Sequence, residues 1–147
     1  MWRGLIVLTL LLGAAGVAHA DSRYFCSADD KDVRFTLESA FEDAGGHKLI
    51  HFRGALMLKD AAKSPNFNKR IFESKDLTNR WSHDGDLRLE VFDMEGDDAG
   101  SETLDLAVLA GENGKPSPNF GGTYALRIEN GASFFVVEGK VSCGTKK

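Results

Sequence analysis

Cysteine is scarce in this chain, which has only Cys26 and Cys143 among its 147 residues. Neither cysteine belongs to a Cys-x-x-Cys pair or adjoins a histidine, so the common zinc-binding and redox motifs are excluded. The sequence also lacks the Gly-x-Ser-x-Gly, Ser-x-x-Lys and His-Glu-x-x-His signatures and a glycine-rich phosphate loop. This absence counts against catalysis without excluding it, and we predict no metal and no cofactor.

Basic residues are outnumbered, because 18 lysines and arginines stand against 22 aspartates and glutamates and the formal net charge is −4. The only basic cluster is Lys146-Lys147. Nucleic-acid binding needs a basic surface that neutralises phosphates. The composition therefore predicts no nucleic-acid partner.

Long apolar runs are confined to the beginning of the chain. Met1-Trp2-Arg3 leads into an apolar stretch from Leu5 to Val17, and Ala18-His19-Ala20 follows. A basic start, an apolar run shorter than the roughly 18 residues that span a bilayer, and a small-x-small end are typical of a secretory signal peptide. We predict cleavage after residue 20, one domain over residues 21–147, a periplasmic or secreted location, and no membrane anchor after cleavage.

The two cysteines are expected to pair, because an exported domain with an even cysteine count normally forms disulfides. A Cys26–Cys143 bond would join the first and last strands and stabilise the fold by at most about 4 to 5 kcal/mol. Cys26 has the same parity as Tyr24, and Cys143 the same as Val137. Both sulfur atoms are therefore predicted to face the interior.

Apolar and polar residues alternate with a period of two through the rest of the chain, which indicates strands with one buried face. Gly45-Gly46, Asp84-Gly85 and Asn130-Gly131 mark turns between such segments. Only 60–63 could form a short helix. The fold class predicted is all-β, an antiparallel sandwich or small closed barrel of about 7 to 8 strands. The alternating segments are 33–41, 50–58, 70–73, 77–81, 87–91, 104–110, 124–128 and 135–143.

A repeated tetrapeptide is the most distinctive motif, with copies at Ser64-Pro65-Asn66-Phe67 and Ser117-Pro118-Asn119-Phe120. Serine before proline restricts the backbone and asparagine tolerates left-handed geometry, so each copy predicts a turn. Two interpretations remain open. Each phenylalanine could close one end of the core, or Asn66, Phe67, Asn119 and Phe120 could form a paired surface for a partner.

The acidic segment from Asp93 to Asp98 suggests a calcium loop, but it departs from the EF-hand pattern. The glycine expected at the sixth position is Asp98, and the glutamate expected at the twelfth is Leu104. A nonstandard cation site at 93–98 stays open beside a solvated loop. His47 and His51 would lie about 13 Å apart on one strand, too far to share an ion.

Together these features favour an exported, non-catalytic binding or inhibitory module of the cell envelope. Its partner would be an envelope protein or a cell-wall polymer. The alternatives are an envelope hydrolase without a recognisable motif and a carrier of a small apolar ligand. The inward set contains few small or polar residues, which favours a filled interior over a carrier's cavity. These small or polar residues are Ser39, Gly54, Ala110 and Gly139.

In outline, an exported all-β domain with a cysteine near each end resembles the small periplasmic lysozyme-inhibitor proteins. The Ser-Gly-x-x-Tyr stretch expected of that group is absent here. No site residue is therefore carried over, because likeness of fold does not assign function.

Overall fold

The computed structural model describes residues 22–42, 48–83, 86–97, 100–111 and 118–146. The predicted signal peptide, residues 1–20, lies outside these ranges. Among the described residues, nine antiparallel strands form one sheet in the order β4-β3-β2-β1-β9-β8-β7-β6-β5. The strands are β1 (Ser22–Asp29), β2 (Val33–Phe41), β3 (Leu49–Leu58), β4 (Lys69–Glu73), β5 (Leu77–His83), β6 (Asp86–Glu95), β7 (Glu102–Gly111), β8 (Asn119–Asn130) and β9 (Ser133–Lys146).

The predicted all-β class is confirmed, with one strand more than the upper estimate. The additional strand is β1, whose alternation is weak because Phe25 faces outward and the inward positions Cys26 and Ala28 are small. Two 3-10 turns, η1 (Ala61–Lys63) and η2 (Ser74–Asp76), are the only helical elements in the described part of the chain. The first of them lies in the predicted helical stretch.

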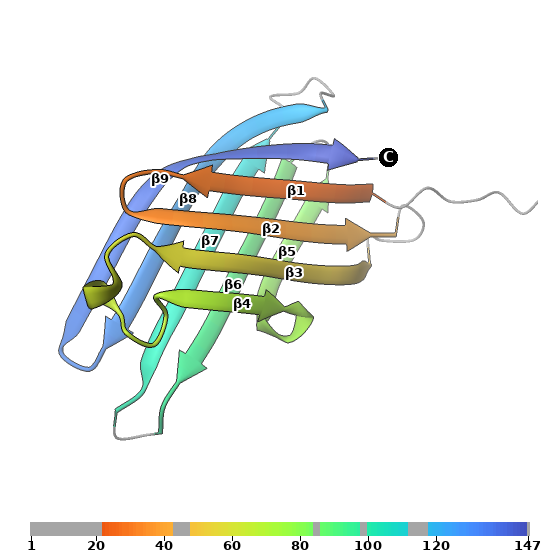
Figure 1. The fold of residues 1–147 in the computed structure, drawn as a ribbon. Helices are drawn as coiled ribbons and strands as arrows, with labels where there is room; N and C mark the ends of the chain where they lie inside the picture. The colour runs from red at the N-terminus through yellow and green to blue at the C-terminus, as the bar shows by residue number, and fades with distance from the viewer. Residues whose placement is uncertain (1–21, 43–47, 84–85, 98–99, 112–117, 147) are drawn as a thin grey trace, which may run out of the picture.

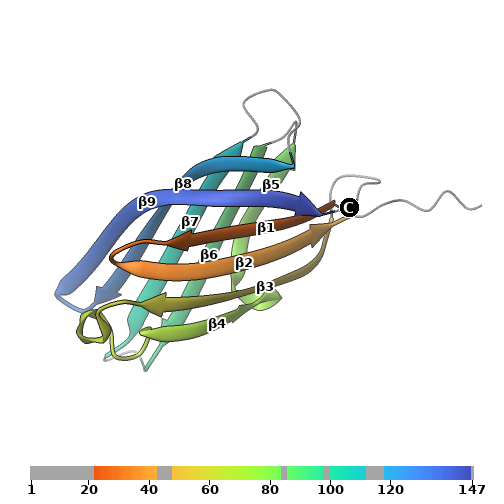
Figure 2. The same ribbon diagram turned by 45° about the horizontal axis from the view of Figure 1, so that its top comes forward.

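The sheet folds over itself into a nearly closed barrel with two layers (Figure 1). Strands β1 to β4 lie side by side in the front layer, and β5 to β8 cross behind them at a steep angle (Figures 1 and 2). The long strand β9 pairs with both β8 and β1 and so joins the two layers. At the β8–β9 hairpin, Gly131 has a φ of 55°, a left-handed conformation that glycine adopts without strain, which confirms the turn predicted there.

A single cluster of buried apolar side chains fills the space between the layers, and every strand contributes to it. The disulfide is part of this core: Cys26 and Cys143 are directly paired across β1 and β9, with their Cα atoms 4.1 Å apart. Both cysteines are buried. The predicted bond and its inward orientation are therefore confirmed.

The barrel has a seam, because β4 and β5 are the two edges of the sheet. Arg70 of β4 crosses it and forms ion pairs with Asp93 and Glu95 of β6. Ser74 of η2 covers part of the β3 edge, since its hydroxyl accepts a hydrogen bond from the Phe52 amide and donates one to the Phe52 carbonyl. Within the described residues, no helix is long and apolar enough to cross a membrane.

Candidate functional site

The two tetrapeptide copies do not form one surface. Figure 1 shows the chain after η1 at the end of the barrel that holds the β1–β2 turn, whereas β8 begins at the other end. Phe67 is fully buried and Phe120 is 7% exposed. The prediction of an exposed phenylalanine pair is therefore wrong for the two rings, because each ring fills its own part of the core. Asn66 and Asn119 are both exposed, but the two copies of the tetrapeptide that contain them lie at opposite ends of the barrel.

Each ring reaches the core in a different way. The Ser64 hydroxyl accepts a hydrogen bond from the Phe67 amide at 3.0 Å, which closes a turn and directs the ring inward beneath the Arg70 guanidinium. Phe120 is an inward residue of β8 and packs edge-on against Tyr24. Ser117 lies outside the described residues. Within the described residues, the two copies therefore differ in local structure, because Phe67 follows a turn and Phe120 lies within a strand.

A groove lies instead on the outer face of the front layer, and we call it the front groove. Its floor is a row of small outward residues that are directly paired across three strands, Ser27, Thr36 and Ala55. Ile71 of the edge strand β4 continues this row. Because small side chains alternate with larger neighbours on either side, the row is sunk below the surrounding surface.

Apolar side chains lie at the two ends of the front groove. Phe25 is 37% exposed and Ile71 is 69% exposed, and with the floor, Glu38 and Arg53 they line a hollow of about 550 Å³. An adjoining hollow of about 440 Å³ shares Thr36, Ala55 and Ile71 and extends past Met57 to Lys69. The groove is continuous across the front layer and open to solvent along its length.

Charged rows flank the front groove on both sides. On the first side, Glu38 forms ion pairs with Arg53 at 2.6 Å and with Arg23 at 3.8 Å. Both arginines and the glutamate come from neighbouring strands of the front layer. The Glu38 carboxylate is therefore paired with two cations, and Glu73, in register with Arg53, adds a second carboxylate to this side.

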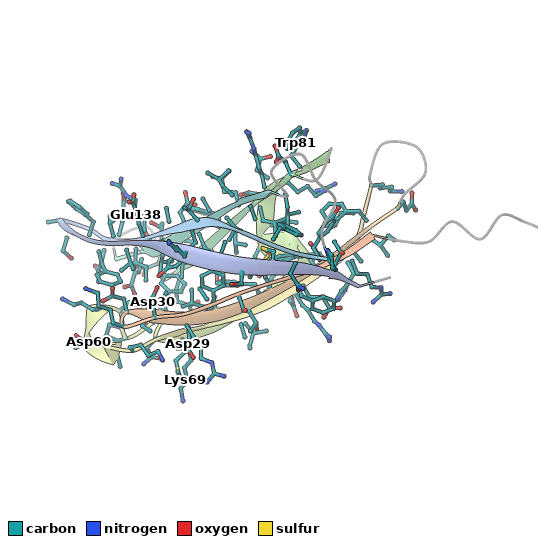
Figure 3. The ribbon with its side chains drawn as sticks, turned by 90° about the horizontal axis from the view of Figure 1, so that it is seen from above. Asp29, Asp30, Asp60, Lys69, Trp81 and Glu138 are labelled. Carbon is teal, nitrogen blue, oxygen red and sulfur yellow. A yellow bond between two sulfur atoms is a disulfide. The ribbon has the colours of Figure 1, made fainter. Side chains whose placement is uncertain are left out.

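On the second side, the row consists of Asp29, Arg34, Met57 and Lys69 in register. Asp29 pairs with Lys59 at 2.7 Å and with Arg34 at 3.6 Å. The hydrogen bond from Lys59, together with the charge of Arg34, holds the pKa of Asp29 below its ordinary value. Figure 3 shows Asp29 and Lys69 on the outer side of the front layer.

The opposite outer face carries a hollow of about 480 Å³ over β7, β8 and β9, which we call the back hollow. Ala107 and Ala125 lie in its floor, and Leu109 is the exposed apolar residue at its rim. In Figure 3, Glu138 and Trp81 lie on this side of the molecule, away from Asp29 and Lys69. The two faces therefore offer a direct comparison between hollows of similar size.

Two carboxylates of the back face, Glu90 and Asp105, repel each other. Burial, together with the neighbouring charge of Glu90, raises the pKa of Asp105 above its ordinary value, although Arg127 opposes this effect. Glu90 and Asp105 lie on adjacent strands that pair from end to end.

The acidic segment at 93–98 is occupied by protein contacts where the structure describes it. Asp93 and Glu95 bind the Arg70 guanidinium, and hydrogen bonding to Asp93 is the main cause that raises the pKa of Arg70. Asp98 and His47 lie outside the described residues. Among the residues that are described, no group of three or more His, Cys, Asp or Glu side chains is arranged to hold a metal ion.

Sequence reasoning missed the front groove. The outward positions of Phe25 and Ile71 follow from strand alternation, and an exposed apolar residue on a strand is the signal that could have indicated it. Their proximity depends on the register of β1 to β4, which alternation alone does not determine.

Comparison of the chain with protein-family models, with curated proteins and with solved structures found no match. Function is therefore inferred from the residues of the chain itself.

Proposed function

We propose that this chain is an exported, non-catalytic binding module that holds another protein of the cell envelope in its front groove. The observation that carries the proposal is the continuous groove between Phe25 and Ile71, two apolar side chains that the fold leaves exposed. Exposed apolar residues around a hollow are typical of protein contact surfaces. Export is supported by the signal-like residues 1–20 and by the disulfide, which is stable in an oxidising compartment.

A contact role fits the chemistry of the groove better than a catalytic one. Its floor has no ionisable side chain, since it consists of Ser27, Thr36 and Ala55. The neighbouring carboxylates of Glu38 and Asp29 are paired with arginine and lysine side chains. Groups held in this way can orient a bound chain, whereas acid catalysis needs a carboxyl group with a raised pKa near the reacting bond.

Filling the groove provides the test. Ala55→Leu adds a larger side chain to the floor, and Ala125→Leu makes the same change in the back hollow as a matched control. We expect the mature protein to capture a partner from an envelope extract, and the purified partner to bind wild type and Ala125→Leu. Ala55→Leu should weaken this binding at least about tenfold, because overfilling a packed contact costs on the order of 1 to 3 kcal/mol.

A second pair of variants removes apolar contact instead of adding bulk. Ile71→Ser should weaken partner binding, and Leu109→Ser, at an exposed leucine of the other face, should not. Equal binding by all four variants would contradict a role for the front groove. Turnover of an envelope polymer by the purified protein, or uptake of an apolar dye into the barrel interior, would instead support the hydrolase or the carrier.

A further inference from the structure

The second flank of the front groove is basic although the chain as a whole is acidic. The row in register contains two cations, Arg34 and Lys69, and one acidic residue, Asp29. Lys59, just outside the row, also pairs with Asp29. The formal net charge of the chain is −4. A local excess of positive charge on a negatively charged molecule attracts an anionic partner and orients it before contact.

Lys69 is the cation best placed to bind such a partner. It is exposed, it lies directly beside Met57 in the register of β3 and β4, and it lines the groove together with Arg34 and Ile71. Among the described residues, no carboxylate forms an ion pair with it. Arg34 and Lys59, in contrast, share the single carboxylate of Asp29.

The shape of the groove fits an extended chain. The floor crosses from β1 to β4, which is three inter-strand spacings, or about 14 Å. An extended polypeptide rises about 3.3 Å per residue, so about four residues cover this length. Pockets for compact small molecules enclose most of the ligand surface, whereas this groove is open along its length.

We propose that the front groove binds a short, extended, acidic polypeptide segment that carries an apolar side chain. The apolar side chain packs on the floor against Ile71, and the carboxylates of the segment face Arg34 and Lys69. This inference rests on the proposed function and adds the chemistry of the bound segment. The first flank contributes less to recognition, because the charges of Arg23 and Arg53 are balanced by the carboxylates of Glu38 and Glu73.

Fluorescence anisotropy with labelled peptides tests the inference on the disulfide-bonded mature protein. The probes are the pentapeptides Asp-Glu-Leu-Asp-Glu, Lys-Lys-Leu-Lys-Lys and Ser-Ser-Leu-Ser-Ser. We expect the acidic peptide to bind at least about tenfold more tightly than the other two at about 50 mM salt. Its affinity should fall when salt is raised to about 300 mM, because screening weakens exposed charge pairs.

Charge reversal at Lys69 tests whether this residue contributes to binding of the acidic peptide. Lys69→Glu should weaken binding of the acidic peptide about fivefold or more, since exposed ion pairs contribute up to about 1 kcal/mol each and reversal adds repulsion. Lys140→Glu, which makes the same change beside the back hollow, is the control and should bind like wild type. Equal losses in the two variants would show a nonspecific effect of net charge and would overturn the inference.

The remaining outcomes separate the inference from the proposed function. If all three peptides bind equally and Ile71→Ser abolishes binding, the groove is a binding site but its preference for acidic segments is refuted. Tighter binding of an acidic polysaccharide than of the acidic peptide also refutes it. If no peptide binds and the captured partner binds Ile71→Ser like wild type, both the inference and the proposed function fail.

Discussion

The two ends of the barrel contain the same tetrapeptide, yet they are stabilised by different interactions. At the turn end, which holds the β1–β2 turn and η1, Phe67 is brought inward by a hydrogen bond between its own amide and the Ser64 hydroxyl. At the disulfide end, Phe120 is one inward position of β8 and lies directly across from Cys143. Burial of the ring is common to both. The surrounding element therefore determines how a short motif is used.

Polar interactions hold the turn end together. The Asp30 carboxylate accepts hydrogen bonds from the amides of Asp32 and Val33 and from the Tyr124 hydroxyl, so it ties the β1–β2 turn to β8. Arg70 ties the edge of the front layer to β6 across the seam. These contacts depend on charge, so we expect the turn end to respond to pH.

The disulfide end is held by a covalent bond and by aromatic packing. Tyr24 packs edge-on against Phe41 and Phe120, with ring centroids 5.9 Å and 6.3 Å apart. The disulfide joins β1 to β9 in the same half of the molecule. This end should respond to reductant and to loss of apolar volume, and much less to pH.

Removal of the disulfide should have the largest effect. Cys26→Ala/Cys143→Ala should lower the free energy of unfolding by up to about 4 to 5 kcal/mol, because the bond closes a loop with a sequence separation of 117. Urea unfolding of the oxidised, reduced and doubly substituted proteins measures the loss. Hydrogen exchange should show that β1 and β9 lose protection before β6 and β7. Earlier loss in β6 and β7 would contradict the division between the two ends.

Truncation of the two buried rings, Phe67 and Phe120, should cause the second largest loss of stability. We expect Phe67→Ala and Phe120→Ala each to cost about 3 to 5 kcal/mol in thermal unfolding, as large-to-small changes in a core do. Phe134→Ala is the control, since that ring is 70% exposed and its loss should change stability by less than about 0.5 kcal/mol. Stability close to wild type in either buried variant would restore a surface role for that copy.

The sequence predicts β2 to β9 because each of these strands buries one face, so its apolar residues alternate. The small inward residues Cys26 and Ala28 leave β1 without this signal. The disulfide follows from compartment and parity, and the β8–β9 turn follows from Asn130-Gly131. The front groove could not be predicted, because Phe25 and Ile71 are far apart in sequence and come to line one groove only through the register of four strands. The ion pairs of Arg70 depend in the same way on how the two edges of the sheet meet.

Loss of the ion pair across the seam should have an intermediate effect. Arg70→Met and Asp93→Asn should each cost about 2 kcal/mol, since hydrogen bonds to charged groups contribute about 1.5 to 3 kcal/mol and both side chains are largely shielded from solvent. A double-mutant cycle in urea should give a cost for the pair well below the sum of the single costs. Arg80→Met, at an exposed arginine of β5, is the control. Additive costs would show that the two residues act independently.

The smallest expected effect is the acid sensitivity of the turn end. Burial acts to raise the pKa of Asp30, but the hydrogen bonds from Tyr124 and from the two turn amides outweigh it and lower the pKa below its ordinary value of 3.8. A lowered folded-state pKa gives stability that is present above the unfolded-state pKa and is lost as pH falls through the folded-state value. Tyr124→Phe should therefore cost about 1 kcal/mol at neutral pH and less at about pH 2 to 3. The measurement is the urea midpoint of unfolding as a function of pH. Asp30→Asn should reduce the loss of stability between neutral pH and about pH 2 to 3, because it removes the titrating group. If both variants lose stability at low pH as wild type does, the acid sensitivity of the protein arises elsewhere. The distinction between a polar end and a covalently held end would then fail.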